Sequence, residues 1–386
     1  MNTTRTVAHL TERYAETGET YVYEQALLAR RHSSIFLSEV KQYNNFIPVE
    51  PYAYFRRALP GTFANRAVRF VAEKVAQPPY LALLNRFLAS RARRAGAGLI
   101  HAHFGMMGFK ALGTRRALKL PMITTFYGVD ASQCVRSPYW IPRFQALFRE
   151  GDLFVVLCEE VVERLTALGC PRDKIRVWDI GIPLDDYPYR APRPTPSPKL
   201  LCVARFVEKK GYHVLLPAFQ RLVTRHPGTT LTIAGHGPLK ADVERLVVDL
   251  GLSGRVTMVD TTAVADFFAF FKRALDEHDL FVLPSVVARN GDDESGPPVV
   301  LTNAMAVGLP IVSTPVGGIP RAIRDGDTGV LTAPNDVEDL AAKISALIDQ
   351  PDRWRGLSQR ARALAEDRFN LTRQIEKLEE MYDEFL

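Results

Sequence analysis

The sequence predicts an α/β protein in which parallel sheets are covered by helices on both faces. Over residues 199–314, short apolar runs alternate with stretches that carry a helical apolar stripe, and this alternation is typical of parallel sheets. The chain has 386 residues, of which 47% are hydrophobic and 24% are charged, as in ordinary globular proteins. This length suffices for two domains, each with a core of its own.

The second half of the chain carries the clearer pattern. Apolar runs bounded by glycine, proline or charged residues predict strands, and the apolar stripes between them predict helices. The expected strands are residues 199–204, 230–234, 255–259, 280–284 and 310–314. The expected helices are residues 212–225, 239–250, 265–277 and 299–307, followed by an amphipathic last helix at 371–386.

The first half predicts fewer elements. Strands that end in polar residues are expected at residues 99–103, 122–126, 153–157 and 175–178. Because ligands of parallel sheets bind beyond the carboxyl ends of the strands, those polar ends are candidate site residues. Residues 185–198 hold five prolines in a polar setting. Such a stiff connector marks the expected boundary between a domain of residues 1–190 and one of residues 191–370.

The composition argues against secretion and against a membrane span. No apolar run near Met1 is long enough for a signal peptide, and no window approaches about 18 uninterrupted apolar residues. The four cysteines lack the paired spacing of a metal site or a disulfide framework; they are Cys134, Cys158, Cys170 and Cys202. We therefore expect a protein of the reducing cytoplasm.

A basic surface is expected in residues 51–100. One acidic residue stands there against nine basic ones, which are interleaved with aromatic and aliphatic side chains: Arg56, Arg57, Arg66, Arg69, Lys74, Arg86, Arg91, Arg93 and Arg94. Such a face can bind an anionic membrane, which would place the protein peripherally on the inner face of the cell membrane. A solvated helical face has the same composition and remains the alternative. No nucleic-acid motif accompanies the charge, so nucleic acid is not an expected partner.

The segment 294–308 joins two expected strands and opens its helix with Gly296, Pro297 and Pro298. Prolines fit the first turn of a helix, where a missing N–H group costs no hydrogen bond. The N–H groups from Val299 onward, together with the helix dipole, form a site for an anion such as a nucleoside diphosphate.

Two other loops offer groups that suit a phosphate. Arg205 and Lys210 follow the first strand of the second domain, and an arginine fork with a mobile lysine charge can stabilise a departing diphosphate. Lys209 could replace Lys210, since only spacing separates them, and a solvated basic loop is the alternative for this segment. Gly235 and Gly237 follow the next strand, and glycines let a backbone approach a ligand closely.

No metal site is expected. His101 and His103 share one face of a strand, so they could in principle bind a metal, but the sequence suggests no third ligand. Burial with backbone partners is the alternative for these histidines. Asp292, Asp293 and Glu294 are adjacent on a loop and lack the spread of ligands that a divalent ion requires. We expect Asp292 and Asp293 to be solvated loop charges.

These segments resemble the retaining glycosyltransferases of family 4. The segment after residue 293 is similar to the family's Glu-Gly-x-Pro followed by Glu-Ala-Met-Ala, and the basic loop is similar to its Gly-Arg-Leu…Lys-Gly. His101-Ala-His103 resembles its His-x-His segment. Thr124-Thr-Phe-Tyr127-Gly-Val-Asp130 resembles its Thr-x-His-Gly-x-Asp segment, with Tyr127 in place of the histidine.

Two further departures from the family's pattern lie in the second half of the chain. Ala204 stands at the glycine of the basic loop, and Asn303 stands at the helical glutamate. In the register that Ala304-Met305-Ala306 fixes, the first glutamate falls at Ser295. We interpret 296–298 as carrying one inserted residue, which leaves Glu294 as the sugar-facing carboxylate. Asn303 can still bind ribose hydroxyls, because an amide both donates and accepts hydrogen bonds.

The resemblance implies a GT-B fold, with two facing Rossmann-like domains and a last helix, 371–386, that crosses back to the first. It implies transfer of a hexose from a UDP- or GDP-type sugar nucleotide to a lipid-linked or polysaccharide hydroxyl in surface glycan synthesis, with retention and without cofactor or metal. The first domain would bind the acceptor.

The resemblance also implies site residues. The implied catalytic residues are His103, Tyr127, Asp130 and Glu294, and the implied donor-binding residues are Arg205, Lys210, Gly235, Gly237, Glu294, Gly296, Pro298, Val299 and Asn303. The departures also fit a catalytically weak member that binds sugar nucleotides or serves as a partner subunit. A sugar-nucleotide epimerase of the same architecture is a third hypothesis.

Overall fold

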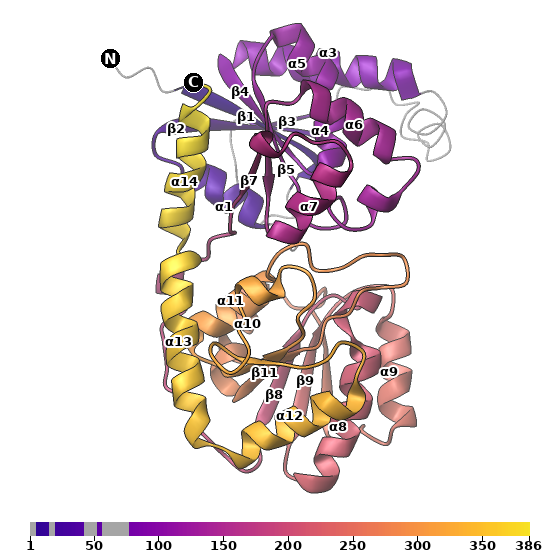
Figure 1. Cartoon of the computed structure of the whole chain (residues 1–386), viewed down its shortest axis with the longest axis vertical. Helices are drawn as coiled ribbons and strands as arrows, with labels where there is room; N and C mark the ends of the chain where they lie inside the picture. The colour runs from indigo at the N-terminus through magenta and orange to yellow at the C-terminus, as the bar shows by residue number, and fades with distance from the viewer. Residues whose placement is uncertain (1–4, 15–19, 42–51, 56–76) are drawn as a thin grey trace. The chain divides into compact units, whose positions relative to one another are not determined.

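The computed structural model describes residues 5–14, 20–41, 52–55 and 77–386, and its chain divides into two compact units. Unit 1 comprises residues 1–181 and 371–386, and unit 2 comprises residues 182–370 (Figure 1). Within the described residues, no helix combines the length and the apolar character needed to cross a membrane.

Unit 1 is built on a seven-stranded parallel sheet in the order β3-β2-β1-β4-β5-β6-β7. The strands are β1 (Arg5–Tyr14), β2 (His32–Lys41), β3 (Tyr52–Tyr54), β4 (Ala97–His103), β5 (Met122–Thr125), β6 (Leu153–Val156) and β7 (Ile175–Val177). Its helices are α1 (Thr20–Leu28), α3 (Gln77–Arg94), α4 (Gly105–Lys110), α5 (Leu112–Leu118), α6 (Ile141–Glu150), α7 (Glu159–Ala167) and α14 (Leu371–Asp383).

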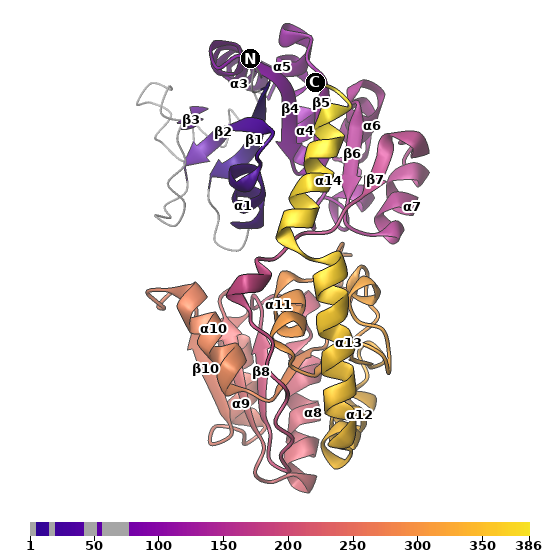
Figure 2. The ribbon, with the colours of Figure 1, turned by 90° about the vertical axis from the view of Figure 1, so that its left-hand side faces the viewer.

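Alternation along the strands assigns the two faces of this sheet, because successive side chains of a strand point to opposite faces. Ala8, Ile100 and Ala102 belong to the core under α3 to α7, whereas Val7 and Leu99 belong to the core under α1 and α14. Helices α1 and α14 are in contact, and Figures 1 and 2 show both of them away from α3 to α7. Odd-numbered residues of β1, β4 and β5 therefore face α1 and α14.

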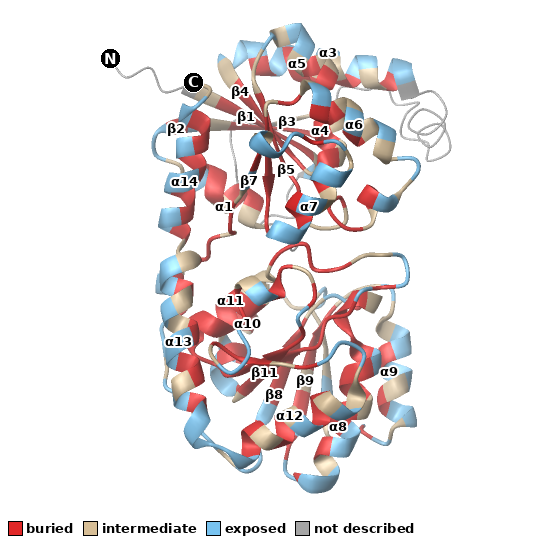
Figure 3. Cartoon of the chain, in the orientation of Figure 1, coloured by how far each residue is buried: buried red, intermediate tan, exposed pale blue. Residues whose placement is uncertain are grey.

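Unit 2 is built on a six-stranded parallel sheet in the order β10-β9-β8-β11-β12-β13. Its strands are β8 (Lys199–Val203), β9 (Thr230–Gly235), β10 (Val256–Asp260), β11 (Leu280–Leu283), β12 (Ile311–Ser313) and β13 (Val330–Leu331). Its helices are α8 (Tyr212–Arg225), α9 (Lys240–Asp249), α10 (Phe267–Glu277), α11 (Val299–Val307), α12 (Val337–Asp349) and α13 (Asp352–Arg368). Figure 3 shows that the sheets are buried, while the exposed positions fall on the outer sides of the helices.

In both sheets, successive strands of the chain are first added toward one edge of the sheet and then toward the other. We call the place where the direction changes the reversal point. In unit 1 this point lies between β1 and β4, and in unit 2 it lies between β8 and β11. The loops that leave the two strands at such a point run to opposite faces, and the crevice between them is where open α/β sheets bind ligands. The fold thus directs attention to the residues that follow β1 and β4, and to those that follow β8 and β11.

The proline-rich stretch belongs to unit 2 and is not a free connector between domains. The division falls after Gly181 rather than at residue 190. Arg190 explains the difference, because its guanidinium donates to the carbonyl oxygens of Leu275 and His278 and its N–H donates to Val307 O at 2.8 Å. Arg362 similarly donates to Tyr187 O at 2.7 Å. This stretch is therefore fastened to the helices of unit 2.

Candidate functional site

The loops after β8 and β11 meet at the reversal point of unit 2. Val286 donates its N–H to Lys209 O at 2.8 Å. Gly211, with φ of 69°, lies so close to the other loop that a Cβ there would meet Pro284 O at 1.9 Å. Only glycine fits this approach. The two loops are therefore locked together, and their charged side chains share one buried site.

Lys210 and Glu294 form an ion pair in this site. Lys210 Nζ donates to Glu294 Oε1 at 2.6 Å, and Ser285 Oγ donates to the same oxygen at 2.8 Å. Both side chains are at least nine-tenths buried. Burial lowers the pKa of Lys210, and the Glu294 carboxylate opposes that shift. Burial alone would raise the pKa of Glu294, but the Lys210 and Lys209 ammonium groups hold it below its usual value.

Lys209 and its acidic partners correct one expectation. Asp292 and Asp293 are not solvated loop charges: Lys209 Nζ donates to Asp292 Oδ1 at 3.0 Å and to Asp293 O at 2.8 Å, and Asp293 is buried. Because the main-chain turn places both lysines inside, Lys209 does not simply substitute for Lys210 but neutralises a second acidic group. Arg205, in contrast, is exposed.

Helix α11 begins at Val299, on the same loop that carries Glu294, and Pro298 precedes it with φ of −56°. Its Asn303 side chain is 6% exposed, and no described residue donates a hydrogen bond to the Oδ1 atom. A buried acceptor without a donor costs about 1–3 kcal/mol. Asn303 Oδ1 is therefore a buried acceptor whose hydrogen-bonding capacity the described residues leave unused.

The glycines near the site have packing roles in the protein itself. A Cβ on Gly235 would meet Ala204 O at 2.0 Å, and a Cβ on Gly237 would meet Phe206 O at 2.7 Å. Both glycines thus allow their loop to lie against residues 204–206. Gly296 is buried, and a Cβ on Gly318 would meet the Cα of Gly296 at 2.4 Å. These close contacts fix the backbone around the start of α11.

Three histidines gather at the reversal point of unit 1. His9 pairs with His101 across β1 and β4, and odd-numbered His103 lies on the same face. Their nearest ring nitrogens all lie within 4.8 Å of one another. The sequence prediction missed His9, because only the register of the two strands places it beside the other histidines.

All six ring nitrogens of these histidines have side-chain partners among the described residues. The alternative of backbone partners for His101 and His103 is therefore wrong, although both residues are buried. His101 bonds through Nδ1 to Tyr382 OH and through Nε2 to Thr125 Oγ1, both at 2.7 Å. His9 Nδ1 lies 3.0 Å from His103 Nε2. Burial lowers the pKa of His9 to about 3 and lowers the pKa values of His101 and His103 well below 6.5. The cluster offers a third potential metal ligand, but a metal would have to break several of these bonds.

Tyr127 and Asp130 complete the unit 1 group. Tyr127 OH lies 2.8 Å from His103 Nδ1. The fully buried Asp130 carboxylate accepts from the N–H groups of Gly105 at 2.9 Å, Gly128 at 2.9 Å and Tyr127 at 3.1 Å. Burial raises the pKa of Asp130, and these backbone donors oppose the shift. Asp130 therefore holds the loops after β4 and β5 in place.

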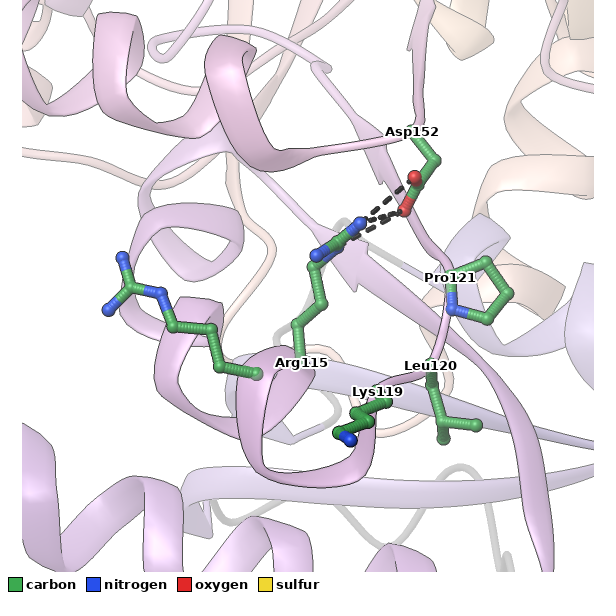
Figure 4. Close-up of a pocket in the computed structure, with 6 residues that line it drawn as sticks. Arg115, Lys119, Leu120, Pro121 and Asp152 are labelled. Atoms are coloured by element: carbon green, nitrogen blue, oxygen red, sulfur yellow. Dashed lines mark hydrogen bonds and ion pairs between the residues drawn. The ribbon is translucent and has the colours of Figure 1, made fainter.

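A cavity of about 430 Å³ lies elsewhere in unit 1 (Figure 4), lined by Arg115, Arg116, Lys119, Leu120, Pro121 and Asp152. Met122, the first residue of β5, donates its N–H to Asp152 Oδ2 at 2.8 Å, which places this cavity at the amino-terminal edge of the sheet. Arg115 makes a bidentate pair with Asp152, and Arg116 pairs with Glu150. Its arginines are thus already neutralised, and the cavity lies at the wrong end of the strands for the expected site.

The expected basic face is only partly described. Arg56, Arg57, Arg66, Arg69 and Lys74 lie outside the described residues, so the structure says nothing of them. Helix α3 carries the rest, and all of these arginines are exposed: Arg86, Arg91, Arg93 and Arg94.

Comparison with known proteins covers both units. Residues 186–364 match the family model of group 1 glycosyl transferases, and residues 5–186 match that of glycosyltransferase family 4. WcaL of Salmonella typhimurium, a protein named for colanic acid biosynthesis, is 33% identical over 290 residues, which are 73% of this chain and 70% of WcaL. AmsK of Erwinia amylovora, an amylovoran biosynthesis glycosyltransferase, is 33% identical over 291 residues, 75% of this chain and 70% of AmsK.

Solved structures share the fold. HepE of Anabaena, in complex with UDP and glucose, superposes with a TM-score of 0.77 over 98% of this chain and 100% of that chain, at 17% identity. Sucrose-phosphate synthase of Thermosynechococcus elongatus gives a TM-score of 0.77 over 98% of each chain, at 19% identity. The expected α/β fold of the GT-B class, with two Rossmann-like parts, is confirmed.

Proposed function

Because the chain belongs to glycosyltransferase family 4, we propose that it transfers a sugar from a UDP- or GDP-type donor to a hydroxyl of a growing surface glycan. The names of WcaL and AmsK support a secreted or surface polysaccharide as the product. The UDP in the HepE crystals supports a nucleoside diphosphate as the ligand.

The buried Lys210–Glu294 pair beside the start of α11 carries this proposal. A diphosphate at the helix start would meet the positive end of the α11 dipole and the Lys210 ammonium group. The ribose would meet Asn303, whose buried Oδ1 has no donor within the described residues, and the sugar would meet Glu294. The Lys210–Glu294 pair lies where the loops after β8 and β11 meet, at the reversal point of the sheet, and α11, which carries Asn303, follows the second of these loops.

The chemistry follows from those charges. When the glycosidic bond to the donor breaks, negative charge grows on the departing diphosphate, and Lys210, the exposed Arg205 and the amides of α11 can stabilise it. These groups can replace a divalent cation, so we propose a metal-independent reaction. Retention of the anomeric configuration is proposed from the family, with the acceptor hydroxyl attacking from the face that the diphosphate leaves.

A ligand screen followed by a turnover assay tests this function. Among UDP- and GDP-sugars, the true donor should raise the unfolding temperature, since a ligand at 100 times its Kd adds about 2.7 kcal/mol of stability. Release of the nucleoside diphosphate should then depend on a glycan acceptor and should persist in excess chelator. Absence of stabilisation by every nucleotide would overturn the proposal. Binding without turnover would instead favour a sugar-nucleotide-binding subunit.

We further propose that the acceptor is lipid-linked and that exposed arginines of α3 hold the protein at an anionic membrane. Each basic residue near such a surface contributes on the order of 1 kcal/mol. Charge reversal at Arg91, Arg93 and Arg94 should release the protein from anionic vesicles at low salt. Charge reversal at Arg353 and Arg355, which are exposed on α13, is the matched control. Protein that stays in solution before any mutation would favour a soluble acceptor.

A further inference from the structure

A chain of hydrogen bonds runs through the buried core of unit 1 and ends on Tyr127. Ser34 Oγ lies 3.3 Å from His9 Nε2, and His9 Nδ1 lies 3.0 Å from His103 Nε2. His103 Nδ1 then lies 2.8 Å from Tyr127 OH. We call these four residues, Ser34, His9, His103 and Tyr127, the relay. Ser34, His9 and His103 come from β2, β1 and β4, and Tyr127 comes from the loop after β5.

A backbone carbonyl fixes the direction of the relay. Ser34 Oγ donates its proton to Ala26 O at 2.8 Å, and a carbonyl oxygen can only accept. A serine hydroxyl has one proton, so Ser34 must accept from His9 through Nε2–H. His9 Nδ1 is then the bare nitrogen of the ring, provided that the ring is neutral.

Burial keeps the rings neutral. The pKa of His9 is lowered to about 3, and that of His103 lies well below 6.5, so each ring has one N–H group and one acceptor nitrogen near neutral pH. His103 must therefore donate from Nε2 to His9 Nδ1. Its own Nδ1 is left as an acceptor, and Tyr127 donates its hydroxyl proton to it.

We propose that Tyr127 serves as a hydrogen-bond acceptor for a substrate hydroxyl. Ser34, His9 and His103 are positioning residues, because they keep the hydroxyl proton of Tyr127 in its bond to His103 Nδ1. This inference rests on the proposed function, because it needs a hydroxylated substrate beyond the carboxyl end of β5. An isolated tyrosine hydroxyl can rotate to donate or to accept. The relay removes that choice, and it therefore selects substrate groups that donate.

Packing keeps the relay in register. The His9 ring stacks on Phe36 with centroids 5.0 Å apart, and the His103 and Tyr127 rings lie nearly parallel at 5.9 Å. Rings held this way cannot turn to exchange their nitrogens without moving their neighbours. The same packing disfavours a metal ion, because coordination by His9 and His103 would break the bond between them.

Nitrogen NMR of protein labelled with ¹⁵N-histidine tests the direction without any substrate. The relay requires the Nε2–H tautomer at both His9 and His103. The Nδ1–H tautomer at both rings would mean that Tyr127 accepts from His103 and donates outward, which would overturn the proposal. Stoichiometric metal bound to these rings in the purified protein would overturn it as well. The NMR measurement gives its answer even if the protein transfers no sugar. Failure of the relay can therefore be distinguished from failure of the proposed function.

Steady-state kinetics then tests the consequence. Ser34→Ala, which frees the His9 tautomer, should raise a substrate KM roughly fivefold with little change in kcat, as expected for the loss of one neutral hydrogen bond. Ser34→Thr should restore it. Thr125→Val, which removes a hydroxyl from His101 outside the relay, is the matched control and should leave KM unchanged. An unchanged KM in Ser34→Ala, or an equal rise in Thr125→Val, would show that the bonds are only structural.

Discussion

Lys210 and Glu294 are counter-charges of one another in a buried place, so removal of either leaves the other uncompensated. Lys210→Ala should therefore act twice. It should lower kcat by a factor of about 10²–10³, as for the loss of one strong donor to a growing charge, and it should lower the free energy of unfolding by about 3–5 kcal/mol. Nucleotide release and chemical denaturation measure the two effects.

A double variant separates them. In Lys210→Met with Glu294→Gln, both charges are gone, so much of the lost stability should return while turnover should not. Lys240→Ala, at a partly exposed pair with Asp260, is the control and should change neither quantity much. Full turnover in the double variant would remove the phosphate role from Lys210.

Asn303→Glu should tighten nucleotide binding. The side chain stands at the position of the family's glutamate, and its Oδ1 lacks a donor within the described residues. A hydrogen bond to a charged acceptor contributes about 1.5–3 kcal/mol, against about 1 kcal/mol for a neutral one. Calorimetry with the bare nucleoside diphosphate measures the change. Asn303→Asp places a carboxylate on a side chain of the native size, so it tests whether the longer glutamate is needed to reach the ribose. Weaker binding in both variants would mean that α11 does not contact the ribose.

Helices and strands whose apolar residues recur at a regular spacing could be predicted from the sequence. Strands that are recognisable only by their pairing with distant strands could not. α11 lies at its expected bounds of 299–307, and β8 to β12 lie within a residue or two of theirs. The strands β1 and β2 were not predicted, although both lie inside the unit 1 sheet, between β3 and β4. Their side chains mix polar and apolar residues on both faces, and their burial comes from neighbours distant in sequence.

The candidate sites follow the same rule. The proximity of Lys210 and Glu294 could be expected from motifs that end two strands. That of His9 and His103 could not, because it depends on the register of β1 against β4. The burial of Asp293 and the anchoring of Arg190 depend likewise on which groups fold against them. A local composition of charges or prolines cannot tell a solvated segment from a fastened one.

Glu379 is one of the α14 side chains that bond the rest of unit 1, and its two backbone partners make its contribution testable. Glu379 is buried and accepts from the N–H groups of Arg30 and Arg31 at 2.8 and 2.5 Å. Glu379→Ala leaves these donors unpaired, so unit 1 should unfold about 1–3 kcal/mol more easily. Scanning calorimetry should show this, with nucleotide affinity unchanged in unit 2. Glu380→Ala, at the exposed neighbouring position, is the control, and equal losses would place the stabilisation elsewhere.

For the whole molecule, the buried histidines predict a loss of stability in acid. Above a pH of about 6.5 the rings are neutral in both the folded and the unfolded chain, so they add no pH dependence. Below it, the unfolded chain binds protons that folded His9 resists until its pKa of about 3, and His101 and His103 behave alike. The free energy of unfolding should then fall by up to about 1.4 kcal/mol per pH unit for each histidine.

Denaturation at several pH values between 7 and 4 measures that slope. His9→Asn should make it shallower, since one titrating group is lost. His213→Asn removes an exposed histidine and should leave the slope as it was. A slope that does not respond to His9→Asn would show that other groups govern the acid transition.

The division of the chain also sets an order of events during synthesis on the ribosome. Unit 2 is a continuous insertion whose ends meet, since Ile182 donates its N–H to Phe369 O at 2.8 Å. Unit 1 needs residues 371–386, from which Tyr382 bonds His101 and the main chain of Gln374 accepts from Trp178. The first unit to emerge is therefore the last that can be completed, and its histidine cluster stays open until translation has passed through all of unit 2.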